Sequence, residues 1–222
     1  MLQPTTIKFL KDLKKNNSKE WFDKNRKVYE AAKEDFASLV NNVIHQFGKK
    51  DETIANLTAK DCMFRINRDV RFSKDKSPYK TNMGAAFSKG GKKAIVAGYY
   101  FHCEPGQAFV GGGLWMPDAD VVKKVRQEID YCFDEFSKII RNKKFVAQYK
   151  SLEITDETSL SREPKGYEKN NPAIQFIKLK SWLAMSSLTD ADLTDKNLTK
   201  KIVAAFEALQ PLIEFLNRGI EG

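Results

Sequence analysis

The residue types best suited to chemistry in this chain are the cations of one short stretch, residues 64–80. The stretch contains six cations and only two acids, and the cations are Arg65, Arg68, Arg71, Lys74, Lys76 and Lys80. Arginine presents a planar fork of donors that matches a carboxylate or a phosphate, and lysine adds a mobile point charge. We therefore predict that this stretch binds an anion and that these six cations are its ligand-binding residues.

Alternation of apolar and polar residues predicts a strand over residues 64–72. Arg65 and Arg71 share one face of this strand and would clamp the anion, with further charge from the lysines of the following loop. Asp69 would orient one of the arginines. Arg68 falls on the apolar face, where an unpaired guanidinium is costly, so it should have a carboxylate or a ligand as its partner.

Three residues, Asp69, Tyr79 and His102, are candidates for a catalytic role. His102 shares a strand face with Tyr100 by alternation and could act as a general acid or base. The alternative is a packed, hydrogen-bonded histidine. Tyr79 could carry a proton, line the pocket or stack on a base, but it could equally anchor the loop by packing.

The chain shows no pattern that requires a cofactor or a metal. Neither a Walker sequence nor a Rossmann fingerprint is present. The glycines at 111–113 could let a phosphate approach the backbone, but glycine within a strand more often marks a bulge or a close backbone crossing. Asp69 and Asp75 lie among too many cations to hold a divalent ion, so we predict no metal site.

The charge of the chain is concentrated in its first half. Among the 222 residues the formal net charge is +9, and residues 61–93 alone carry nine Lys or Arg against three Asp or Glu. A local excess of this kind attracts anions. Three interpretations stay open: a site for a small anionic ligand, with or without catalysis; contacts to nucleic-acid phosphates; and a scaffold whose cations serve a structural ion-pair network.

The three cysteines, Cys62, Cys103 and Cys132, are widely spaced and show neither a disulfide pattern nor a zinc pattern. The N-terminus lacks the apolar core of a signal peptide, and no apolar run is long enough to span a membrane. We therefore expect a cytoplasmic protein that does not contact a membrane.

Apolar residues at helical spacing predict helices over 4–16, 21–47, 118–140 and 198–216, with shorter ones from Asn142 and from Asn171-Pro172 through Leu183. Asn17 and Glu20 resemble a capping box for the second helix. Residues 94–103 and 108–115 predict a hairpin joined by residues 104–107. These elements indicate one α+β domain over residues 1–222, with a central, mainly antiparallel sheet flanked by several helices.

Several segments together resemble one uncharacterised bacterial family, domain of unknown function family 2461. The matching segments are residues 17–22 with Asn25, Arg26 and Tyr29, residues 64–80, residues 98–105, residues 111–117 and residues 164–167. The resemblance implies a single family-wide domain and a bacterial cytoplasmic setting, and it implies no reaction. The family often shows Asp-His-Pro where this chain has Asn170-Asn171-Pro172, so no catalytic base is expected at that position.

Overall fold

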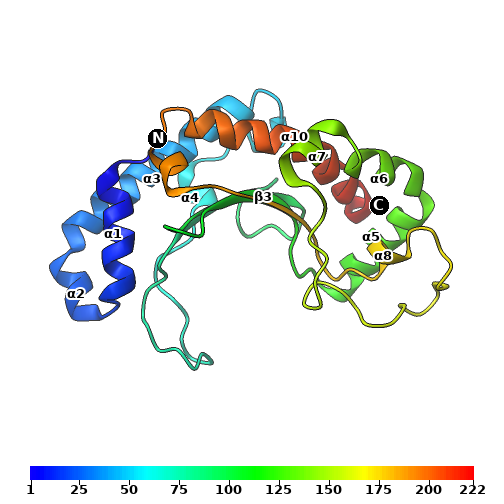
Figure 1. Cartoon of the computed structure of the whole chain (residues 1–222), viewed down its shortest axis with the longest axis horizontal. Helices are drawn as coiled ribbons and strands as arrows, with labels where there is room; N and C mark the ends of the chain where they lie inside the picture. The colour runs from blue at the N-terminus through cyan, green and yellow to red at the C-terminus, as the bar shows by residue number, and fades with distance from the viewer. The chain divides into compact units, whose positions relative to one another are not determined.

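We describe residues 1–222 from a computed structural model (Figure 1). One antiparallel sheet contains four strands in the order β1-β2-β3-β4, and helices form most of the remaining regular structure. The strands are β1 (Met83–Phe87), β2 (Gly98–Cys103), β3 (Phe109–Leu114) and β4 (Trp182–Ser187). The predicted α+β class is therefore confirmed.

The helices are α1 (Pro4–Lys15), α2 (Lys19–Lys24), α3 (Arg26–Phe47), α4 (Ala59–Cys62), α5 (Ala119–Tyr131), α6 (Phe133–Ile140), α7 (Lys143–Tyr149), α8 (Ile174–Ile177), α9 (Asp190–Thr194) and α10 (Leu198–Glu221). None of them combines the length and the apolar character that a membrane crossing requires.

The chain forms two compact units. The first comprises residues 1–93, 100–110 and 187–204, and the second comprises residues 94–99, 111–186 and 205–222. The prediction of a single domain over residues 1–222 stays a prediction.

In the first unit, the long helix predicted over residues 21–47 is divided at Asn25. Ser18, rather than Asn17, caps α2, because its side chain accepts a hydrogen bond from the Trp21 N–H at 3.2 Å. The Asn25 side chain donates to the Trp21 carbonyl, a local bond that competes with a continuous helix. Beyond this break α3 packs on the sheet, where Phe36 stacks on Phe101 of β2 at 5.9 Å.

The prediction of a regular strand over residues 64–72 is wrong. Residues 63–68 do run antiparallel to residues 78–85, through bridges between Met63 and Ala85 and between Asn67 and Tyr79. Between the two bridges, the segment from Tyr79 to Ala85 is two residues longer than the segment from Met63 to Asn67. A bulge therefore breaks the ladder. Pro78 in addition lacks an N–H donor for the ladder. Residues 69–77 form the tip of this loop, drawn in teal in Figure 1.

In the second unit, Asp118 and Asn142 cap α5 and α7 as the sequence predicts, while Cys132 separates α5 from α6. The helix predicted from Asn171-Pro172 through Leu183 ends at Ile177, and Trp182 begins β4 instead. Glycine permits β3 to pair with β4, because a Cβ atom at Gly111 on β3 would overlap the carbonyl oxygen of Ala184 on β4. The glycines at 111–113 therefore serve a close backbone approach.

Candidate anion-binding site

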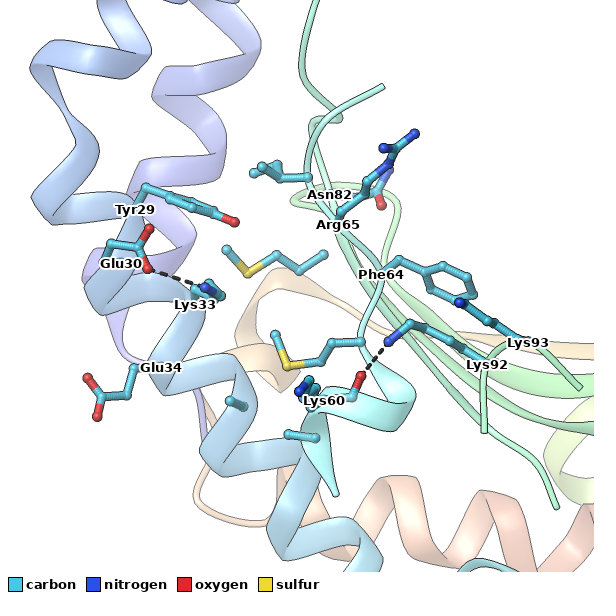
Figure 2. Close-up of a pocket in the computed structure, with 15 residues that line it drawn as sticks. Tyr29, Glu30, Lys33, Glu34, Lys60, Phe64, Arg65, Asn82, Lys92 and Lys93 are labelled. Carbon is cyan, nitrogen blue, oxygen red and sulfur yellow. Dashed lines mark hydrogen bonds and ion pairs between the residues drawn. The ribbon is translucent and has the colours of Figure 1, made fainter. Parts of the chain in front are cut away.

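A hollow of about 820 Å³ lies in the first unit, between α3, α4, residues 63–66, the start of β1 and residues 92–93. Its cationic lining residues are Lys33, Lys60, Arg65, Lys92 and Lys93, and its acidic ones are Glu30 and Glu34. Figure 2 shows the cations on several sides of the hollow, with Lys33 on the α3 wall and Arg65 beside Asn82. The hollow therefore has an excess of positive charge that comes from separate segments of the chain.

Most of this positive charge is not used inside the protein. The Lys33 ammonium lies 3.3 Å from the Glu30 carboxylate, and the Lys92 ammonium donates to the backbone carbonyl of Lys60. The charged groups of Lys60, Arg65 and Lys93 have no hydrogen-bonding or ion-pair partner within the chain. These three side chains are exposed.

The local sequence fixes α4 at the edge of the hollow. Thr58 and Asp61 form a capping box, and the Asn41 side chain accepts a hydrogen bond from the Ala59 N–H at 2.8 Å, which ties α4 to α3. Hydrogen bonds from Thr58, supported by the charges of Lys92 and Lys60, hold the pKa of Asp61 below its usual value. The carboxylate is therefore engaged in capping, and it does not line the hollow.

A glycine turn brings Lys92 and Lys93 to the hollow. Gly90 and Gly91 have φ angles of 86° and 80°, which favour glycine. The Lys92 N–H then donates to the Asp61 carbonyl at 3.0 Å, and the Lys92 ammonium donates to the Lys60 carbonyl. These two bonds hold residues 91–93 against α4, so the turn determines where the two lysines lie.

Two aromatic side chains add apolar surface to the hollow. Tyr29 is held by Phe22 and Phe9, with ring centroids 4.8 and 5.9 Å away, and burial raises the pKa of its hydroxyl. Figure 2 shows the Tyr29 ring extending from α3 toward the space between the helix and residues 64–65. Phe64, which is 39% exposed, lies on the opposite side.

Of the six cations predicted to bind ligand, Arg65 lines the hollow. Lys80 is half-buried beside it: its ammonium lies 5.4 Å from the Phe64 ring centroid, and burial, together with the charge of Arg65, lowers its pKa. Lys74 is exposed at the tip, and the Lys76 ammonium donates to the Val70 carbonyl at 3.0 Å. The structure therefore does not gather all six cations around one space.

The other two arginines are paired with the acids of the same loop. Arg68 forms an ion pair with Asp75 and donates to the Ser77 carbonyl at 3.1 Å, as its position on the apolar face required. Asp69 accepts from Arg71 Nε at 3.0 Å and from Nη2 at 2.7 Å. Asp69 thus orients an arginine, but it occupies the guanidinium fork of Arg71, which does not line the hollow.

Tyr79 lies in the protein interior. Its side chain is 6% exposed and stacks on Phe22, with ring centroids 3.9 Å apart. The structure places it as the packed anchor of the loop, one of the two alternatives drawn from the sequence.

His102 belongs to a chain of hydrogen bonds on the face of β2 that carries Tyr100. The Tyr100 hydroxyl lies 3.3 Å from His102 Nδ1, and His102 Nε2 lies 3.2 Å from the Glu104 carboxylate. An ionised Glu104 can only accept, so Nε2 carries a proton in this contact, and in the neutral imidazole Nδ1 is left to accept from Tyr100. The imidazole also stacks on Phe109 at 4.8 Å, which fixes its plane.

Glu104 is nearly buried, and the residues around it keep it ionised. Burial raises the pKa of its carboxyl, but hydrogen bonds from Thr81 and His102 and the charge of Lys14 outweigh this effect and leave the pKa below its usual value. Thr81 Oγ1 donates at 2.8 Å, and the Lys14 ammonium lies 3.5 Å away. Continued alternation along 100, 102 and 104 would have identified Glu104 from the sequence, whereas nothing there marks Lys14.

The lining cations that the sequence did not identify as site residues are Lys33 on α3, Lys60 on α4, and Lys92 and Lys93, and Tyr29 on α3 was missed as well. The glycine pair at 90–91 within a basic segment is a usable signal for the last two. No signal in the sequence connects α3 with residue 65. No three His, Cys, Asp or Glu side chains lie close enough together to ligate a metal ion.

Residues 5–215 match the family model described as "Conserved hypothetical protein (DUF2461)". No curated protein and no solved structure gives a match.

Proposed function

The chain belongs to the DUF2461 family, and we propose that it binds a small phosphorylated or otherwise anionic ligand in the hollow beside α3. One observation carries this proposal: five cations and two carboxylates line the hollow, and the charged groups of three of the cations form no hydrogen bond or ion pair within the chain. Charge-assisted hydrogen bonds to a phosphate would satisfy them. The cavity of about 820 Å³ lies within the range of small-molecule sites.

The cations divide naturally into two sets around a bound anion. Arg65 offers a rigid fork that suits two oxygens of one phosphate, whereas Lys60 and Lys93 offer mobile ammonium groups. Lys92 is already oriented by the Lys60 carbonyl and keeps donors for a ligand. The role of Arg65 therefore depends on geometry as well as charge, and this difference separates it from the lysines.

Ligand-induced stabilisation tests the proposal directly. Any ligand that prefers the native state raises the melting temperature, so we expect stabilisation by at least one of pyrophosphate, a nucleotide or a sugar phosphate at low ionic strength. The double variant K60A/K93A should lose this stabilisation. K74A/K76A, which removes two charges from the loop tip, is the matched control and should keep it. If no phosphorylated compound stabilises the protein, the proposal is wrong.

A second candidate function, contact with nucleic-acid phosphates, is favoured by the tip of the loop at residues 69–77. Phe72 is 95% exposed there and lies next to Arg71, whose guanidinium is 5.8 Å from the ring centroid. An exposed ring among cations could stack on a base. Asp69 pairs with Arg71 and Asp75 pairs with Arg68, however, so we place this candidate second.

Salt dependence separates the two functions. Affinity for an oligonucleotide would fall by roughly 0.7 to 0.9 log units per log unit of salt for each phosphate neutralised, and F72A would weaken it. Binding in the hollow should be insensitive to F72A.

The proposal includes a cytoplasmic setting. Its support is the state of the cysteines, all three of which are free thiols, as suits a reducing compartment. Asp69, Tyr79 and His102 stay predictions as catalytic residues.

A further inference from the structure

The neutral part of the hollow has a chemical character of its own. Apart from the charged residues, the lining consists of Tyr29, Ala37, Ala59, Met63, Phe64, Ile66, Asn82 and Met83. Asn82 is the one amide side chain among them, and the Tyr29 hydroxyl is the one hydroxyl. Within this neutral part the hydroxyl groups of a sugar would therefore find few side-chain partners, and burying them unpaired there would cost binding free energy.

The apolar part of the lining is accessible. Met63 and Ala37 are partly exposed, and Phe64 is 39% exposed, while Ile66 and Met83 are buried beneath. Both methionines line the hollow together with Tyr29 and Phe64. Methionine is flexible and adapts to an apolar group of irregular shape. The centre of the hollow thus favours an apolar group rather than a polyol.

From this division we infer that the ligand is an amphipathic anion: a phosphate or carboxylate head held by the cations, joined to an apolar body that contacts Met63 and Phe64. The inference rests on the proposed function, since it assumes that the hollow binds anions. It adds a substrate class, because inorganic phosphate or glycerol phosphate alone would leave the apolar surface in contact with water.

A series of monoalkyl phosphates measured by titration calorimetry tests the inference. Ethyl, propyl and butyl phosphate present the same head with bodies of increasing length. A methylene that becomes fully buried should raise the affinity about fourfold, since it contributes about 0.8 kcal/mol. Propyl phosphate should also bind more tightly than glycerol phosphate, which has the same chain with two added hydroxyls.

Two methionine variants test whether the gain in affinity per methylene arises in the hollow. M63Q keeps an unbranched side chain of similar length but makes it polar, and should reduce the gain per methylene. M185Q is the matched control, because Met185 on β4 is exposed and does not line the hollow. M185Q should leave the gain in affinity per methylene unchanged.

The outcomes distinguish this inference from the proposed function. If every member of the series binds with the affinity of inorganic phosphate, the inference is overturned while anion binding stands. The inference is also overturned if M63Q shows the same gain per methylene as the unaltered protein. If no member and no inorganic phosphate binds, both the inference and the proposed function are wrong.

Discussion

The side chain of Asn17 forms two hydrogen bonds with the backbone of Tyr79. Its amide nitrogen donates to the Tyr79 carbonyl at 2.9 Å, and its amide oxygen accepts from the Tyr79 N–H at 3.1 Å. The pair resembles the exchange of bonds between paired strands and fastens the base of the loop at residues 64–80 to the turn before α2. Asn17 thus positions the segment that carries Arg65, although the two residues are far apart in the sequence.

Replacement of Asn17 by alanine should therefore destabilise the protein. The backbone groups of Tyr79 lose both partners in a partly buried site, and we expect a loss of roughly 1–3 kcal/mol in the free energy of unfolding. Chemical denaturation measures this loss. N42A, on the exposed face of α3, is the control and should change the free energy by less than about 0.5 kcal/mol. Equal stability of the two variants would show that the clamp is not formed.

The contact between Gly84 and Tyr100 gives a second prediction. A Cβ atom at Gly84 would overlap the Tyr100 hydroxyl, so G84A should destabilise the protein and displace Tyr100 from His102. Adding Y100F removes the overlapping oxygen and should recover part of the loss. The double variant G84A/Y100F should then be more stable than the sum of the two single changes predicts, with a coupling of roughly 0.5–3 kcal/mol. Strict additivity in a denaturation cycle would contradict the contact.

Glu104 makes the stability of the protein depend on pH under acidic conditions. Its pKa in the folded protein lies below the usual value, so the stabilising contribution is complete above the unfolded pKa and is lost as pH falls through the folded pKa. The stability deficit of E104Q should accordingly be largest near pH 7 and shrink below about pH 4.5. Melting temperatures between pH 7 and pH 3 measure it.

The control for this pH series is E20Q, which alters an exposed carboxylate on α2. The difference in melting temperature between E20Q and the unaltered protein should stay small at every pH of the series. Parallel curves for E104Q and the unaltered protein would mean that Glu104 contributes no pH-dependent stability.

The sequence predicted the elements that local signals determine. The hairpin of β2 and β3 was placed by two strand-like runs and a proline-glycine turn, α1 and α5 by apolar spacing and by their first residues, and α7 by Asn142 alone. β1 was missed because Met83–Phe87 is short and contains glycine and two alanines, which carry little strand propensity. β4 was assigned to a helix because the short apolar run around Trp182 fits both periods.

The site was predicted only in part, for a similar reason. Charge counting identified Arg65, which lines the hollow, because cations cluster in that segment of the sequence. It could not show that Asp69 and Asp75 neutralise two of the other arginines, because those pairs depend on the path of the loop. Nor could it find Lys33 and Tyr29, which reach the hollow only through the packing of α3.

Cysteine reactivity follows from burial. Burial raises the pKa of both Cys62 and Cys103 to about 12, so at pH 8 their thiols are protonated and inaccessible. Cys132, at the break between α5 and α6, is partly exposed. A disulfide reagent should therefore label one thiol in the native protein and three in denaturant, and C132S should abolish the native labelling. Rapid native labelling of two or more thiols would contradict the buried positions.

The most direct test of the central claim, that the hollow binds anions through Arg65, is calorimetric titration of pyrophosphate into four proteins. These are the unaltered chain, R65K, R65A and K74A. We expect clear weakening in R65K, because the planar fork is lost although the charge is kept, stronger weakening in R65A, and no change in K74A. Equal affinity in all four proteins would mean that Arg65 does not bind the anion.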